Sequence, residues 1–532
     1  MKPKSYAGQT IRRKDTFKYT LLLEGIIVGA VSGLVIACFR MLLNAADKVR
    51  NNLGDWATAG GTGRFFILMA VLFSIAVLVS MLLEWEPECS GSGIPQVEGE
   101  LKGRIDMNWL RVIAAKLAGC TLAIGGGLAL GREGPSVQIG AMVGKGFSRT
   151  RHRLLTEERL LITCGAGAGL SAAFGAPLAG AIFALEELHK TFSALVLITT
   201  MASAAVSDWI ASTLIGRDPV FNVSVEHILP LRYYWAVIIL GILLGLLGVF
   251  YNKTLTTMQD FFGRVGKLLP DKFSRFGRMI SIFAVSLLMF YVYPTALGSG
   301  GGLVAAICEG NYALGALAVM LLIKFIYSTG SFGSGAPGGI FLPLLVLGAI
   351  CGGLVSRLLT AGLDVSEEYI VSFVIIGMAG LFAAIVRAPA TGIILITEMT
   401  GSFSSLLALV TVSLTAYVVA DLLGGEPVYD MLWSRRAEAS DNEGSGRDTL
   451  PDRKTIIEGD VHLSSEIEGH TVQELELPAG CLIVAVIRDG AEKIPNGRTK
   501  LKAGDHLEIL CRQSDIAEAE HVLNAKCMNI RD

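Results

Sequence analysis

The stretch Gly131-Arg132-Glu133-Gly134-Pro135 decides how the rest of the chain is interpreted. It follows the mostly apolar run 112–130 and places a carboxylate between two glycines. Glycines let backbone amides approach a ligand closely, and a helix beginning near Pro135 would turn its partly positive end toward an anion. The same amides could hold an external anion or the Glu133 carboxylate, so Glu133 is a candidate gate. The alternative is a turn at the membrane surface whose charges are solvated.

The composition indicates a membrane protein. Charged residues make up 17% of the 532 residues and hydrophobic residues 52%, whereas an ordinary soluble domain is about 25% charged. Many of the 62 glycines fall inside apolar runs, where glycine permits close helix packing and broken helices that line a cavity. A helix needs roughly 20 residues to cross a bilayer. The runs that reach or approach this length are 19–43, 65–83, 234–251, 279–292 with its flanks, and 314–327.

The distribution of charge predicts the orientation in the membrane. Basic residues gather at 2–18, 145–153 and 264–278, and the positive-inside rule assigns these segments to the cytoplasm. The run from Tyr19 is too long for a secretory signal core and has no cleavage pattern after it, so it is expected to be a retained span. The net charge of -2 gives no indication of nucleic acid binding, and the scattered cysteines and histidines lack metal-site spacing. No metal, cofactor or nucleic acid partner is expected.

Three pieces of the apolar region recur in the same order. The matching segments are 91–93 and 298–300, 131–135 and 339–343, and 165–186 and 377–398. Repeats of this size in a membrane protein indicate two structural halves with the substrate site at their interface. The second half, from about Leu231, follows a linker without a basic cluster and precedes the basic loop 264–278. It is therefore expected to start on the outer side, which gives inverted topology.

After the second repeat, the chain is expected to change from an apolar membrane domain to a charged linker and a small α+β domain. The predicted parts are a basic N-terminus at 1–18, a membrane domain at 19–430 with repeats at 19–215 and 231–424, a linker at 431–454, and a cytoplasmic α+β domain at 455–532. Within the last part, the pattern predicts strands at 481–487 and 506–511, a turn at Asp489-Gly490 and a helix at 514–525.

The motifs closely resemble those of a known family. Segments 91–95, 131–135 and 339–343, together with Ala176-Pro177, Ala388-Pro389 and Tyr429, are similar to the anion-binding motifs of the CLC chloride channel and transporter family. The resemblance covers roughly residues 19–429. It implies an all-α polytopic membrane protein with two inverted repeats and broken helices, which forms homodimers with one pore per subunit. The C-terminal part resembles the regulatory TrkA-C (RCK-C) domain of bacterial transport proteins.

The resemblance also assigns the anion site. A central chloride is held by Ser92, Tyr429 and the backbone amides of Ile340 and Phe341. Helix N-termini carry about half a positive charge, and such uncharged donors hold a dehydrated anion weakly enough for turnover. The alternatives are a turn spacer for Ser92 and an interfacial aromatic anchor for Tyr429. The supporting motif residues are Gly91, Gly93, Pro95, Gly131, Arg132, Gly134, Pro135, Gly339 and Pro343.

A second acid, Glu187, distinguishes an exchanger from a channel. The resemblance makes Glu133 the external gate and Glu187 the internal proton-transfer residue. In the repeat, Glu186 aligns with Glu398, but Glu187 aligns with Met399 and has no acidic counterpart. Many CLC channels carry an apolar residue at the position of Glu187, so its presence favours exchange. The alternative is an ion pair between Glu187 and Lys190, at spacing i,i+3.

These features predict a proton-coupled chloride exchanger of the plasma membrane with both termini in the cytoplasm. It is not expected to be an enzyme, since the spans hold no Ser-His or metal-binding arrangement. The alternatives are a passive voltage- or pH-gated chloride channel, a fluoride exporter, which the intact Ser92 disfavours, and a membrane sensor without transport. The C-terminal domain is expected to bind a small ligand such as a cyclic dinucleotide, with Arg488 and Lys493 near a phosphate.

Overall fold

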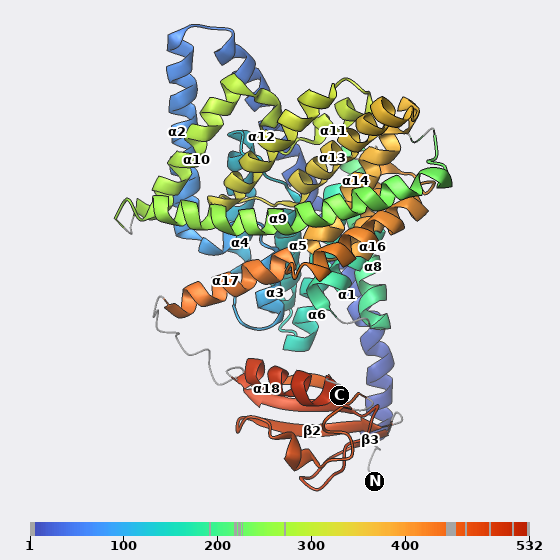
Figure 1. Ribbon diagram of the computed structural model, residues 1–532. Helices are drawn as coiled ribbons and strands as arrows, with labels where there is room; N and C mark the ends of the chain where they lie inside the picture. Colours follow the sequence, from blue (N-terminus) through green and yellow to red (C-terminus); the bar gives the residue numbers. More distant parts are fainter. Residues whose placement is uncertain are drawn as a thin grey trace. The chain divides into compact units, whose positions relative to one another are not determined.

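The computed structural model consists of two compact units, Met1–Arg436 and Ala437–Asp532. It describes residues 6–190, 193–216, 221, 225, 227–270, 273–442, 454–462, 465–488, 491–512 and 515–528. Each unit has a hydrophobic core of its own. Figure 1 shows the helical first unit and the second unit with its sheet.

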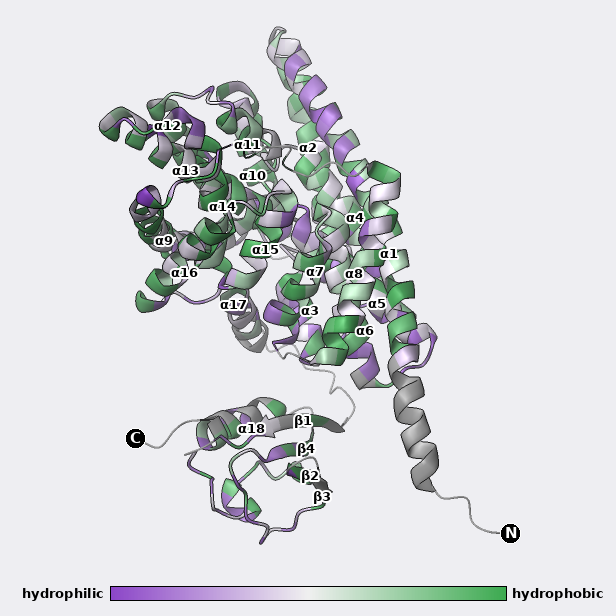
Figure 2. Ribbon diagram, turned by 90° about the vertical axis from the view of Figure 1, so that its right-hand side faces the viewer, coloured by the Kyte–Doolittle hydropathy of each residue, from purple (hydrophilic) through white to green (hydrophobic). Residues whose placement is uncertain are grey.

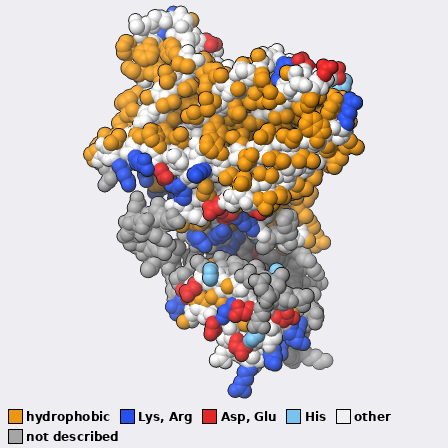
Figure 3. All heavy atoms as spheres, viewed as in Figure 1, with side chains coloured by type: hydrophobic (Ala, Val, Ile, Leu, Met, Phe, Trp, Pro, Cys, Tyr) orange, Lys and Arg blue, Asp and Glu red, His pale blue; other side chains and the backbone are white. Residues whose placement is uncertain are grey.

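The first unit is built from long apolar helices interrupted by short ones. In the described ranges, eight helices are long and apolar enough to cross a membrane. Figure 2 shows apolar residues along these helices, and in Figure 3 hydrophobic side chains cover most of the visible face of this unit. The helices are α1 (Tyr6–Thr58), α2 (Thr62–Trp85), α3 (Ile94–Leu101), α4 (Trp109–Gly125), α5 (Glu133–Thr150), α6 (Leu155–Phe174), α7 (Pro177–Phe183), α8 (Ala194–Ile215), α9 (Tyr234–Gly266), α10 (Ser274–Val292), α11 (Gly301–Cys308), α12 (Leu314–Gly333), α13 (Phe341–Leu363), α14 (Ile370–Val386), α15 (Pro389–Thr400), α16 (Leu406–Leu422) and α17 (Val428–Asn442).

Equivalent segments of the two repeats meet around a two-fold axis. Gly131 and its counterpart Gly339 exchange two backbone hydrogen bonds of 2.7 Å in an antiparallel bridge. A two-fold rotation between the two halves produces such a reciprocal antiparallel contact between equivalent residues. The predicted inverted-repeat fold with broken helices is confirmed.

Glycines allow the helices of each half to pack closely. A Cβ at Gly140 would overlap the carbonyl of Gly165, and α5 and α6 cross there. In the second half, a Cβ at Gly348 would overlap the carbonyl of Gly377, where α13 and α14 cross. The same glycine contact therefore appears once in each repeat, as expected for small residues at membrane helix interfaces.

The predicted linker at 431–454 begins too early. Helix α17 instead extends to Asn442. Its part within the first unit is held there, because Arg436 pairs with Glu88 at 2.6 Å and the Trp433 ring covers Gly99. Residues 443–453 lie outside the described part. At the other end, α1 already begins at Tyr6, so much of the expected N-terminal segment is helical and continuous with the first span.

The second unit is a small α+β domain. Its antiparallel sheet has the strand order β1-β4-β2-β3, and α18 (Ile516–Leu523) packs on it through Leu523 at Gly459. The strands are β1 (Lys454–Asp460), β2 (Cys481–Arg488), β3 (Ala491–Lys493) and β4 (His506–Arg512). Strands β2 and β4 and helix α18 lie where the sequence predicted them, whereas the turn expected at Asp489-Gly490 lies outside the described residues.

Arg488 has a structural partner in this domain. Its Nε and one terminal nitrogen donate to the two carboxylate oxygens of the buried Asp505, both at 2.7 Å. The guanidinium also donates to the Lys500 carbonyl at 2.9 Å. These contacts account for the position of the Arg488 guanidinium, and the phosphate contact expected from the sequence is not needed to explain it. Lys493 is exposed at the end of β3.

Candidate functional site

Three glycine turns place three helix N-termini close together. Helices α3, α5 and α13 begin just after the motifs that contain Ser92, Gly131 and Gly339. The bridge between Gly131 and Gly339 joins the starts of α5 and α13. A Cβ at Gly134 would overlap the Ser92 hydroxyl, so the start of α3 also touches α5. The turn before α3 requires glycine, because Gly91 and Gly93 have φ of 62° and 95°.

The prolines and the remaining motif residues support these helix starts. Pro95, Pro135 and Pro343 lie in the first turns of α3, α5 and α13. Arg132 and Ile340 are the residues that precede the first turns of α5 and α13. Proline suits this location because the first helical amides lack an intrahelical partner.

The Glu133 carboxylate reaches the helix start of the other repeat. Its Oε2 accepts a hydrogen bond from the Leu342 amide at 3.3 Å, and Oε1 has no partner among the described groups. The side chain is fully buried. A carboxylate therefore lies at the N-terminus of α13, where the macrodipole favours negative charge.

Two buried hydroxyls complete the arrangement. Ser92 is 2% exposed and Tyr429 is fully buried, and neither hydroxyl has a hydrogen-bond partner within the described structure. Leaving a buried donor unsatisfied costs about 1–3 kcal/mol, so such donors point to a ligand that accepts hydrogen bonds. Phe341 packs its ring against Phe382, with ring centroids 4.6 Å apart, on the apolar side of the site.

Glu187 lies in the π-helical turn η2 (Ala184–His189) that follows α7. It is 6% exposed, and its Oε1 has no partner in the described ranges. The alternative ion pair with Lys190 is not formed, because Lys190 Nζ contacts Asp430 at 2.7 Å and Glu98 at 3.1 Å. Tyr429 directly precedes Asp430, whose carboxylate contacts Lys190 at the end of η2, so the tyrosine belongs to a segment that reaches the turn containing Glu187.

The neighbouring acid Glu186 has a different task, which it shares with its repeat counterpart Glu398. Glu186 accepts from the amides of Ala390 and Thr391 at 3.2 and 2.8 Å, at the start of α15. Glu398 accepts from the amides of Leu178 and Ala179, at the start of α7, at 3.1 and 2.8 Å. Each acid thus caps a helix of the opposite half. Glu187 has no acidic counterpart, and it takes no part in these symmetric caps.

Two buried lysines were not predicted from the sequence. Lys116 donates to the carbonyls of Cys89 and Gly91, at 3.0 and 2.7 Å, and fixes the turn before Ser92. Lys324 donates to the carbonyls of Ala296 and Gly298, both at 2.8 Å, in the equivalent turn of the second half. The two lysines are separated by the same 208 residues as Gly131 and Gly339. This shared spacing is the signal that could have identified them.

A family comparison agrees with this geometry. Residues 75–421 match the family described as voltage gated chloride channel, and residues 456–524 match the TrkA-C domain. The chain belongs to the CLC family. Its members are transport proteins and not enzymes.

Several relatives cover most of the chain. It is 35% identical over 446 residues to an H(+)/Cl(-) exchange transporter ClcA of Vibrio cholerae, which spans 81% of this chain and 93% of that protein. A ClcA of Salmonella arizonae is 32% identical over 454 residues, 83% of this chain and 94% of that protein.

Solved structures show the same fold. A slow cyanobacterial Cl-/H+ antiporter superimposes with a TM-score of 0.74 at 30% identity, covering 79% of this CLC chain and 99% of the antiporter. A CLC-type fluoride/proton antiporter superimposes with a TM-score of 0.61 at 22% identity, covering 78% of this chain and 97% of the other. At that identity the second comparison supports the fold alone.

Proposed function

We propose that this CLC protein exchanges chloride for protons across a membrane. The observation that carries the proposal is a pair of buried carboxylates, Glu133 and Glu187, each with one oxygen that has no partner in the described structure. The names of the ClcA relatives and of the cyanobacterial antiporter support the same activity.

In the proposed mechanism, Glu133 and chloride compete for the N-terminus of α13. An ionised Glu133 is an acceptor and stays at the N-terminus of α13, where the Leu342 amide donates to it. A protonated Glu133 loses the charge that this helix end favours, leaves the amides and opens the site to chloride. Chloride then binds to the hydroxyls of Ser92 and Tyr429 and to the amides of Ile340 and Phe341. Anion entry thus requires proton uptake.

Glu187 supplies the proton from the other side. Burial makes an isolated carboxylate costly inside a membrane protein, on the order of 2.5–3.5 kcal/mol on insertion scales, so a buried acid without a salt bridge favours a functional role. The nearest cation in the sequence, Lys190, contacts Asp430 at 2.7 Å and Glu98 at 3.1 Å. The cation Lys190 is shared with Asp430 and Glu98, which leaves Glu187 able to take up and release a proton.

The test uses purified protein in liposomes with chloride and pH electrodes. Glu187→Ala should abolish proton movement driven by chloride while chloride flux continues, and Glu133→Ala should do the same. The matched control is Glu368→Ala, which removes an exposed carboxylate and should keep coupled transport. Undiminished proton movement in Glu187→Ala would refute its assigned role, and pH-driven chloride flux in Glu133→Ala would refute the gate.

The assembly and orientation are also proposals. Homodimerisation rests on the family resemblance, and cytoplasmic termini in the plasma membrane rest on the basic segments 2–18, 145–153 and 264–278. Light scattering of the detergent complex should give twice the mass of one chain. Binding of a cyclic dinucleotide to the C-terminal domain rests on the TrkA-C match, and an absence of heat in calorimetry with such nucleotides would remove it.

A further inference from the structure

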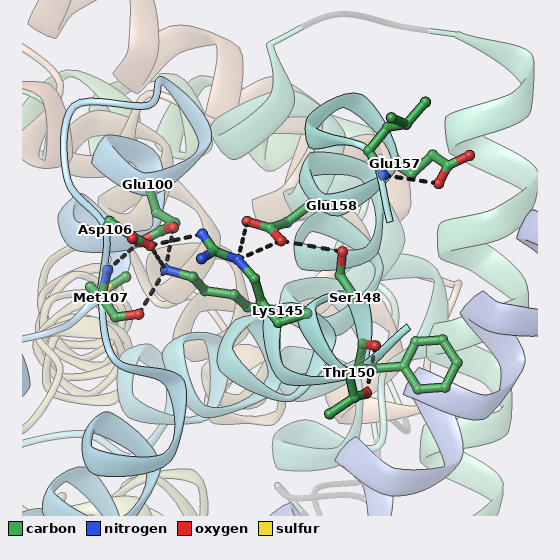
Figure 4. A network of polar contacts seen from close by, with 11 residues as sticks. Glu100, Asp106, Met107, Lys145, Ser148, Thr150, Glu157 and Glu158 are labelled. Carbon is green, nitrogen blue, oxygen red and sulfur yellow. Dashed lines mark hydrogen bonds and ion pairs between the residues drawn. The ribbon is translucent and has the colours of Figure 1, made fainter. Parts of the chain in front are cut away.

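A buried ion pair joins the far ends of the helices α3 and α5. Lys145, near the end of α5, contacts Glu100, near the end of α3, at 2.5 Å (Figure 4). The lysine side chain is 2% exposed and the glutamate 5%. The remaining ammonium donors reach Asp106 at 2.6 Å and the Met107 carbonyl at 2.7 Å. The second Glu100 oxygen accepts from the Met107 amide at 2.7 Å, so both charges are well satisfied.

A second branch of the same network leads away from α3. Arg149, one turn after Lys145, donates from Nε to both Glu158 oxygens at 3.0 and 2.8 Å, and pairs with Asp106 at 2.9 Å. Glu158 belongs to α6. The arginine is 40% exposed. The network therefore has a buried branch that joins α5 to α3 and a more exposed branch that joins α5 to α6, and the two branches meet at Asp106.

The second repeat lacks the buried ion pair at the equivalent contact. With the spacing of Gly131 to Gly339, Lys145 corresponds to Gly353, and with the spacing of Gly91 to Gly298, Glu100 corresponds to Ile307. These counterparts also meet, since a Cβ at Gly353 would lie 2.9 Å from Ile307. The equivalent contact is therefore apolar in the second half. It is an ion pair only in the first half, which contains Ser92 and Glu133.

The ion pair and the anion site lie at opposite ends of the same two helices. Lys145 is 12 residues after Glu133, which corresponds to about 18 Å along α5. At the site end, the contact between Ser92 and Gly134 leaves no room for a Cβ. Gln138 of α5 also fills the space beside Gly93 and donates to the Glu88 carbonyl at 2.9 Å. A tilt or slide of α3 against α5 would thus displace the Ser92 hydroxyl.

We propose that Lys145 and Glu100 are positioning residues that fix α3 against α5, and so set the position of the Ser92 hydroxyl in the anion site. The inference rests on the proposed function, because it concerns the same chloride site. A buried ion pair contributes little net stability compared with apolar packing, but it specifies a single geometry through its directed contacts. A contact with a single geometry at one end of α3 and α5 can fix the position of the Ser92 hydroxyl at the other end.

The experiment measures chloride binding to the full-length purified protein by calorimetry, with the thermal midpoint recorded in parallel. Lys145→Met should raise the chloride Kd about 2- to 30-fold, the range of couplings transmitted through packed elements. Lys145→Arg should restore part of the affinity, because it keeps the charge. Arg149→Gln is the matched control from the exposed branch and should leave the Kd near that of the wild type even where its thermal midpoint falls.

A double variant covers the case in which Lys145→Met fails to fold because Glu100 is left buried and unpaired. Lys145→Met with Glu100→Ile copies the apolar contact of the second half and should fold, with a raised chloride Kd. A wild-type Kd in the folded Lys145 variants would overturn the inference, as would an equal rise in Arg149→Gln. A wild type that binds no chloride would instead refute the proposed chloride site.

Discussion

At the scale of single residues, the site contains buried donors and acceptors that make no hydrogen bond to other groups of the described structure. Ser92 and Tyr429 are buried donors without partners in the described structure, and one oxygen of Glu133 is unpartnered as well. We propose that a carboxylate and an anion occupy this position in turn.

The Tyr429 phenol should contribute to chloride affinity. Tyr429→Phe removes one hydrogen bond to a charged ligand, worth about 1.5 kcal/mol, and should raise the chloride Kd about tenfold in calorimetry. Tyr291→Phe is the control, since Tyr291 is 40% exposed and belongs to α10. An unchanged Kd in Tyr429→Phe would remove the phenol from the site.

At the scale of elements, reciprocal caps bind the two halves to each other. Glu398→Ala removes the acceptor for two amides at the start of α7 and should lower the free energy of unfolding by about 1–2 kcal/mol. Glu186→Ala should cost somewhat more, because Glu186 also accepts from the Thr391 hydroxyl at 2.7 Å. Thermal unfolding in detergent measures both, and a midpoint equal to that of the wild type in either variant contradicts its role as a cap.

The crossing of α5 and α6 gives a sharper test of helix packing. Gly165→Ala would push a Cβ into the Gly140 carbonyl, and no side-chain movement can relieve a clash with backbone. The variant should lose several kcal/mol of stability or fail to accumulate as folded protein. Gly63→Ala provides the control, because nothing lies within 4 Å of a Cβ there. Normal yield and thermal midpoint for Gly165→Ala would show that the helices lie further apart.

At the scale of the whole molecule, the C-terminal domain has its own core and its own pH dependence. Burial alone would raise the pKa of Asp505, but hydrogen bonds from Arg488 and the Lys502 amide outweigh burial and hold the pKa below its usual value. The stability from this carboxylate is therefore complete above its unfolded pKa of about 3.9, and is lost as the pH falls through the lower folded pKa.

Circular dichroism of residues 454–532 tests this pH dependence. Asp505→Asn should unfold at a lower temperature than the wild type at pH 7, and the difference should shrink below about pH 4. Asp460→Asn, which breaks the exposed pair with His506, should change stability by about 0–1 kcal/mol. A difference for Asp505→Asn that persists unchanged at low pH would contradict this assignment.

The sequence predicted the parts of the membrane unit that repeat or form motifs. The family resemblance of the ordered glycine motifs led us to expect that the helix starts near Ser92, Glu133 and Phe341 converge. The contact between Lys145 and Glu100 could not be predicted in this way. The two residues are 45 positions apart in the sequence and belong to no motif, so each resembled an ordinary surface charge. The pair between Arg436 of α17 and Glu88 was missed for a similar reason, since the two residues lie far apart in the sequence.

The reversal potential of the wild-type protein in liposomes is the most direct test of coupled exchange through one site. With a chloride gradient held constant, coupled exchange predicts that the reversal potential shifts when a pH gradient is added, and that chloride flowing down its gradient drives protons uphill. A reversal potential that follows the chloride gradient alone, whatever the pH gradient, would rule out coupled exchange and identify a passive channel.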